Sequence, residues 1–234
     1  MNYWKPFLKK FTNYRELNYI LKNLDNLTPN KNQIFKVFET HPKDIKVIIL
    51  GENPYVNKDM ATGLAFQNGW DKDETKFGNI VKKDVIPLEL KIIYEELIND
   101  YPEFNGINTW QKQGVFLLNL ALTAIRSNPS LHLKYWKKFS ESVIRHISNV
   151  ENNKVWFIWG KNVKSFIPCI KNPYIVEHNK DNIKNIPIFK DRNYVFISAS
   201  PLEQYWGEDQ FFNNNIFFKT NVILEKSGIT KINW

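Results

Sequence analysis

The chain has 234 residues, which is enough for one domain with a sizeable core or for two small domains. No Ser-, Gly- or Pro-rich linker divides it, so we expect a single domain over residues 1–234. Its 32 Lys and Arg against 24 Asp and Glu give a net charge of +8, which permits a polyanionic partner without requiring one, because a soluble Lys- and Asn-rich surface carries the same excess. The single cysteine, Cys169, excludes an intrachain disulfide and a cysteine-based zinc site. The sequence has no apolar signal region and no run near about 18 apolar residues, which predicts a cytoplasmic protein with no membrane partner.

Four short runs of β-branched and aromatic residues lie along the chain, and each stops at a polar cluster. The runs cover residues 46–50, 115–118, 155–159 and 194–197, and the clusters after them are residues 51–55, Asn119, Gly160 and residues 198–202. Runs without polar alternation are typical of strands buried on both faces, which predicts a parallel sheet covered by helices. The intervening residues carry helical patterns, among them 92–98 and 134–148. Ligands of such sheets bind outside the carboxyl ends of the strands, so we expect the polar clusters to meet at one site.

None of the common catalytic or metal-binding motifs accompanies these strands. No Gly-x-Ser-x-Gly elbow, phosphate-binding glycine loop or Gly-x-Gly-x-x-Gly sequence follows any of them, so a hydrolase triad, nucleotide hydrolysis and dinucleotide binding lack support. The histidines lack the spacing of metal ligands; they are His41, His132, His146 and His178. The chemistry must therefore be sought in the polar clusters themselves.

Side chains suited to a nucleobase follow the strands. The tight turn of residues 52–55 is followed by Phe66, and Asn119 ends the second strand. An amide beside a stacking ring suits a flat heterocycle with donor and acceptor edges, and Leu202, directly after Pro201, would suit a wedge in a base stack. The alternative is ordinary turn chemistry, since Asn-Pro and Ser-Pro are common breakers. The residue pattern alone leaves both interpretations open.

Several segments match, in order and in separation, the motifs of one known family. They are residues 46–55, 63–66, 110–123, 135–139, 200–207 and 211–234. Residues 46–55 are similar to a strand followed by a Gly-Gln-Asp-Pro-Tyr-His water-activating loop, and residues 63–66 to a Gly-Leu-x-Phe stretch. Residues 200–207 are similar to a DNA-intercalation loop. From about residue 34 onwards, the chain thus resembles the family 1 uracil-DNA glycosylases.

The resemblance implies a fold, a reaction and a partner. The fold is three-layer α/β/α, with a central four-stranded parallel sheet between helical layers. The reaction is hydrolysis of the bond between a base and its deoxyribose after the nucleotide is flipped out of single- or double-stranded DNA, with no metal or other cofactor. Leu202 would enter the duplex where the nucleotide left, while Ser200 and Pro201 would pinch the backbone phosphates. The resemblance also implies a monomer.

Three further positions would form the base pocket by this resemblance. Phe66 would stack on the flipped base, and Asn119 would hydrogen-bond its Watson–Crick edge. Tyr55 would fill the space beside C5 and exclude the methyl group of thymine. All three residue types of the family's pocket are present in this chain.

The acid–base residues of the family are replaced. Asn53 stands at the position of the catalytic Asp, Glu52 at that of the loop Gln and Val56 at that of the loop His. Ser198 takes the place of the strand-end His, Glu89 that of a phosphate-contacting Ser and Trp206 that of an Arg. The reaction builds positive charge on the sugar and negative charge on the base, and losing one group aimed at such charge costs roughly 10²–10³ in rate.

Three interpretations follow. In the first, the chain is a glycosylase that works slowly or with altered specificity: Asn53 holds a water, Glu52 or less readily Asp59 supplies a carboxylate, and Ser198 donates a hydrogen bond to the base. In the second, it is a non-catalytic DNA-binding protein that acts in replication or occupies lesions. In the third, its substrate is another pyrimidine, and Glu52 would accept a hydrogen bond from the exocyclic amine of that base. We favour the first, because the base-binding residues are intact.

Overall fold

The computed structural model describes residues 2–12, 14–22, 27–69, 86–177, 185–203 and 211–234 of the chain. Five parallel strands form one sheet in the order β3-β2-β5-β7-β6. They are β2 (Val47–Gly51), β3 (Val115–Asn119), β5 (Lys154–Trp159), β6 (Pro173–Ile175) and β7 (Asn193–Ser198). The four predicted strands are confirmed, and every residue of the first three is buried, as runs without alternation predict. The expected count of four is one short, because the brief edge strand β6 was not predicted.

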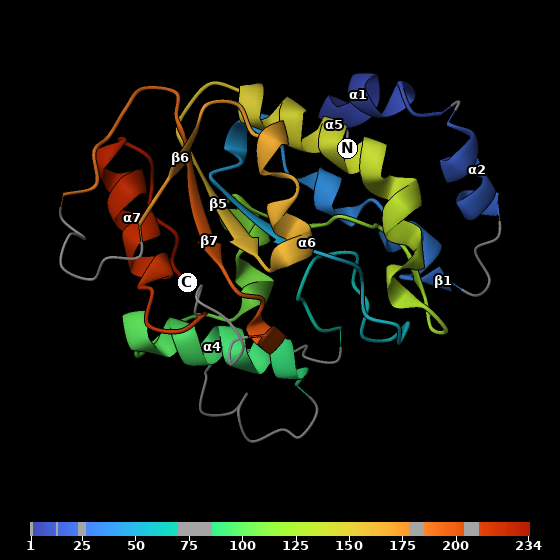
Figure 1. The fold of residues 1–234 in the computed structure, drawn as a ribbon, viewed down its shortest axis with the longest axis horizontal. Helices are drawn as coiled ribbons and strands as arrows, with labels where there is room; N and C mark the ends of the chain where they lie inside the picture. The colour runs from blue at the N-terminus through green and yellow to red at the C-terminus, as the bar shows by residue number, and fades with distance from the viewer. Residues whose placement is uncertain (1, 13, 23–26, 70–85, 178–184, 204–210) are drawn as a thin grey trace.

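Helices cover both faces of this sheet (Figure 1). The α-helices of the described residues are α1 (Lys5–Lys9), α2 (Arg15–Lys22), α4 (Leu88–Asp100), α5 (Leu133–Asn149), α6 (Lys161–Lys164) and α7 (Ile216–Lys226). Strands β1 (Leu27–Thr28) and β4 (Ala124–Ile125) form a separate antiparallel pair. The helix predicted at residues 134–148 is α5, and the one predicted at 92–98 is part of the longer α4.

Alternate side chains of the strands supply the two halves of the core. On one face, the ring of Phe116 lies 5.8 Å from that of Trp4 and 5.9 Å from that of Phe38. On the other, the ring of Phe157 lies 5.5 Å from that of Phe217 in α7. Figure 1 shows α5 and α1 on the first side of the sheet and α4 and α7 on the second. The predicted three-layer α/β/α class is therefore confirmed.

The N-terminal segment, which matches no motif, packs on the outer layer. The indole Nε1 of Trp4 donates a hydrogen bond of 2.7 Å to the carbonyl of Thr40. The rings of Phe7 and Phe11 lie 6.2 Å and 5.0 Å from that of Phe139 in α5. This segment therefore extends the aromatic core. Among the helices within the described residues, none has both the length and the apolar character needed to cross a bilayer.

Asn193 joins three elements at the start of β7, and its loss should destabilise the fold. The buried side chain accepts from the indole Nε1 of Trp156 at 2.8 Å and donates to the carbonyls of Ser148 at 3.1 Å and Lys171 at 2.6 Å. Each buried polar group left unpaired costs about 1–3 kcal/mol, so Asn193→Ala should lower the free energy of unfolding by about 3 kcal/mol. Urea denaturation measures this change.

A matched control is the exposed Asn149, whose amide makes one local hydrogen bond to the carbonyl of Arg145. Asn149→Ala should change the free energy of unfolding by no more than about 0.5 kcal/mol. Equal effects of the two substitutions would contradict the role given to Asn193.

Candidate functional site

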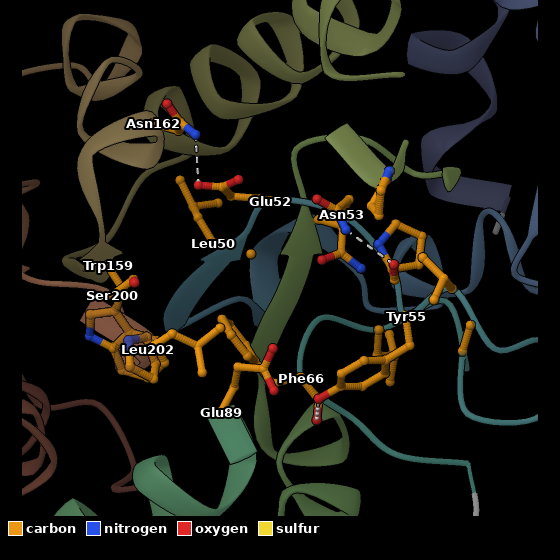
Figure 2. Close-up of a pocket in the computed structure, with 18 of the residues that line it drawn as sticks. Leu50, Glu52, Asn53, Tyr55, Phe66, Glu89, Trp159, Asn162, Ser200 and Leu202 are labelled. Carbon is orange, nitrogen blue, oxygen red and sulfur yellow. Dashed lines mark hydrogen bonds between the residues drawn. The ribbon is translucent and has the colours of Figure 1, made fainter. Parts of the chain in front are cut away.

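A cavity of about 520 Å³ opens at the carboxyl ends of the strands (Figure 2). It is lined by the predicted site residues Glu52, Asn53, Tyr55, Phe66, Asn119, Ser200, Pro201 and Leu202. They come together because the parallel register places Gly51 beside Asn119 and Trp159 beside Ser198. The expected meeting of the polar clusters is thus confirmed, and the cavity lies where open parallel sheets hold ligands.

The floor of the cavity is formed by Asn119 and Phe66 on either side of Gly51. A Cβ atom added to Gly51 would lie 2.6 Å from Asn119 Oδ1 and 3.5 Å from Phe66 Cε2. Asn119 is only 4% exposed, yet its amide makes no hydrogen bond within the part of the chain that the structure describes. The ring of Phe66 and the amide of Asn119, which is unpaired among the described residues, therefore border the same small space. Gly51 leaves this space open because it has no side chain.

Backbone strain and a second aromatic ring fix the position of Phe66. Its φ of 63° lies in the left-handed region, which a bulky residue adopts only when its surroundings enforce it. The ring of Trp159, at the end of β5, packs edge-on against it at 5.5 Å between centroids. Trp159 also lines the cavity and was not predicted as a site residue. Its position at the end of a strand, in register with Ser198, is the signal that identifies it.

Tyr55 closes one side of the cavity and supports the turn at Phe66. Its hydroxyl donates a hydrogen bond of 3.3 Å to the carbonyl of Phe66. Burial raises the pKa of the Tyr55 phenol well above its usual value, and the nearby charge of Glu89 raises it further. The phenol therefore stays neutral and keeps the proton that it donates.

The loop after β2 carries the predicted residues Glu52 and Asn53, whose side chains have different hydrogen-bond partners. The carboxylate of Glu52 accepts a hydrogen bond of 3.0 Å from Asn162 Nδ2, and Figure 2 shows it turned toward that residue, away from Phe66. Asn53 Nδ2 donates to the carbonyl of Pro54 at 3.2 Å, which leaves Asn53 Oδ1 without a donor among the described residues. Asp59 is exposed and does not line the cavity. Asn53 thus offers an acceptor to the cavity, whereas Glu52 is already engaged.

Ser198 does not reach the cavity with the other predicted residues. Its side chain is 4% exposed and does not line the cavity. Its hydroxyl donates a hydrogen bond of 3.2 Å to the carbonyl of Ala199. A direct hydrogen bond from Ser198 to a ligand on the cavity floor is therefore not supported by this geometry.

Leu202 lies at the mouth of the cavity. Its side chain is 48% exposed, whereas the adjacent Pro201 is buried. The Ser200 hydroxyl accepts a hydrogen bond of 3.2 Å from the backbone of Glu203, so this short turn is held by its own side chain. The rest of this segment, residues 204–207 with Trp206 among them, lies outside the described residues, as does His178.

The chain is similar to known proteins along most of its length. Residues 38–221 match the family model described as the uracil DNA glycosylase superfamily. The uracil-DNA glycosylase of Photorhabdus laumondii is 32% identical over 213 residues, which cover 88% of this chain and 80% of the relative. That of Pseudoalteromonas translucida is 31% identical over 248 residues, covering 100% and 99%.

A solved structure extends the likeness to the fold. The crystal structure of mimivirus uracil-DNA glycosylase superposes with a TM-score of 0.74 at 20% identity, covering 100% of this chain and 86% of the other. At this identity the likeness concerns the fold alone, and it agrees with the three-layer arrangement around the central sheet.

Proposed function

Because the chain belongs to the uracil DNA glycosylase superfamily, we propose that it flips uracil, or a related pyrimidine, out of DNA and hydrolyses the bond between that base and its deoxyribose. The observation that carries the proposal is the cavity floor, where the ring of Phe66 and the amide of Asn119 flank Gly51. Stacking against Phe66 and hydrogen bonding to Asn119 together suit a pyrimidine edge.

The proposed reaction breaks one bond and consumes one water molecule. The bond between C1′ of the sugar and N1 of the base breaks, and its electron pair leaves with the base. A water oxygen then bonds to C1′, and the proton that it loses ends on the base. Asn53 Oδ1, which has no donor among the described residues, would accept a hydrogen bond from that water. Asn119 would donate to the base as negative charge develops on it.

The test is a measurement of base release. Single- and double-stranded oligonucleotides carrying one uracil are incubated with excess protein, and abasic sites are detected by alkaline cleavage. We expect release from uracil-containing strands and none from matched strands carrying thymine, because Tyr55 occupies the wall of the cavity. Tight DNA binding without abasic sites would instead support the alternative, a non-catalytic DNA-binding member of the superfamily.

Gly51→Ala should strongly slow base release without unfolding the protein. The added Cβ would lie 2.6 Å from Asn119 Oδ1 and 3.0 Å from Ala65 Cβ, so the methyl group occupies the space in which the base edge meets the amide. We expect a fall of at least about 10²-fold in the rate of uracil release, similar to the loss of one aimed hydrogen-bond donor. Rates are measured under single-turnover conditions.

This variant also identifies any contaminating glycosylase, whose activity would survive in the Gly51→Ala preparation. Val56→Ala serves as the control, because Val56 also lines the cavity but is exposed at its edge. It should retain most of the activity. Unchanged release by a folded Gly51→Ala protein would show that the base does not bind at this floor.

A further inference from the structure

Glu89 brings a carboxylate into the cavity from the first turn of α4. Figure 2 shows its side chain pointing into the cavity on the side of Phe66 and Tyr55. The residue is half-buried, and within the described residues its carboxylate makes no hydrogen bond and no ion pair. Its charge is felt at Tyr55, where it adds to burial in raising the pKa of the phenol. An ionisable group that has no partner in the described part of the chain therefore faces the space proposed for the substrate.

The other carboxylates of the cavity are placed differently. Glu52 is bound to Asn162 Nδ2 at 3.0 Å and turned toward α6. Glu203, in the turn that carries Leu202, is exposed at the rim. No Lys or Arg is among the described residues that line the cavity. Glu89 is thus the carboxylate that remains available inside it.

The depth of the residues indicates which part of a nucleotide Glu89 would meet. The base-binding amide of Asn119 is 4% exposed on the floor, and Leu202 is 48% exposed at the mouth. If the base binds on the cavity floor, its sugar lies between the floor at Asn119 and the mouth at Leu202. Helix α4 packs against the turn of Leu202, and Glu89 lines the cavity beside that turn. Glu89 is longer than the phosphate-contacting Ser with which the resemblance aligns it, so its carboxylate extends further into the cavity, toward the sugar.

We propose that Glu89 is a catalytic residue that contacts the sugar of the flipped nucleotide and stabilises its positive charge. The proposal rests on the proposed function. As the electron pair of the C1′–N1 bond leaves with the base, the sugar becomes cationic, and an ionised carboxylate beside it lowers the energy of that state. Bonds and protons balance without Glu89: the water supplies the new bond to C1′, and the proton of that water ends on the base. The chain thereby regains, from another element, the negative charge that Asn53 does not carry.

Glu89→Gln removes this charge while keeping the shape of the side chain. We expect the single-turnover rate of uracil release to fall about 10²–10³-fold, the usual effect of removing one aimed electrostatic group. Glu203→Gln removes the same charge from the rim and should change the rate only a few-fold. Thermal unfolding of each variant shows whether the fold is retained.

A binding measurement tests the effect of the negative charge of Glu89 without catalytic turnover. DNA carrying a cationic pyrrolidine in place of the abasic sugar is compared with DNA carrying the neutral tetrahydrofuran analogue. The wild-type protein should prefer the cationic form, and Glu89→Gln should lose that preference while Glu203→Gln keeps it. A preference that is unchanged in Glu89→Gln would overturn the proposal.

The outcomes separate this proposal from the proposed function. If the wild-type protein releases uracil and Glu89→Gln releases it equally fast, the catalytic role of Glu89 is overturned alone. If the wild-type protein releases no base at high excess, the proposed function fails, and the catalytic role of Glu89 fails with it.

Discussion

Replacing Asn119 with alanine is expected to slow uracil release by about 10²–10³-fold, because the substitution removes the donor that we propose faces the base. The amide lies on the cavity floor and makes no hydrogen bond within the described residues, so the substitution breaks no hydrogen bond among them. As the bond to the sugar breaks, negative charge moves onto the base, and the Asn119 amide would meet that charge in a site shielded from water. Single-turnover rates on uracil-containing DNA measure the loss.

Two further variants make this result specific. Asn162→Ala removes an amide from the opposite wall of the same cavity, where it contacts Glu52 rather than the floor, and should have a much smaller effect. Asn119→Asp replaces the amide donor with an acceptor, which should repel the uracil carbonyl and favour the exocyclic amine of cytosine. If Asn119→Ala released uracil at the wild-type rate, the proposed hydrogen bond from Asn119 to the base would be contradicted.

The sheet and the floor of the site could be predicted from the sequence because both follow from local patterns. Uninterrupted apolar runs identify buried parallel strands, and a polar residue directly after such a run, as at Asn119, must lie at the carboxyl edge. The edge strand β6 has no such signal: it is three residues long, mostly exposed, and begins with Pro173. A proline is tolerated there because one side of an edge strand needs no ladder hydrogen bond.

The directions of the side chains could not be predicted in this way. Glu52 and Ser198 follow strands as Asn119 does, yet Glu52 turns to Asn162 and Ser198 to its neighbouring carbonyl. Those choices depend on partners that only the packed fold brings close. Glu89 shows a different case: the resemblance places it at a phosphate-contacting position, but its approach to the cavity arises because α4 packs against the turn of Leu202.

Asn53→Asp is expected to raise the rate of uracil release by about 10²–10³-fold, since it restores a charged group aimed at the sugar and the attacking water. Asn53 lines the cavity, and aspartate has nearly the same shape, so the new carboxylate fits the same space. The hydrogen bond that Asn53 Nδ2 donates to the Pro54 carbonyl would be lost, at a cost of about 1 kcal/mol in stability. Single-turnover rates measure the gain, and it should disappear as the pH falls below about 4, where the new carboxyl becomes neutral.

The size of this gain depends on what Glu89 already supplies. If Glu89 places one negative charge beside the sugar, a second at position 53 adds less than it would alone, and it also repels the first. Asn53→Asp should therefore raise the rate more in the Glu89→Gln background than in the wild-type protein, and a double-mutant cycle measures the difference. Equal gains in both backgrounds would mean that the two side chains act on separate steps or that Glu89 does not reach the sugar. No gain in either would place the water elsewhere than beside residue 53.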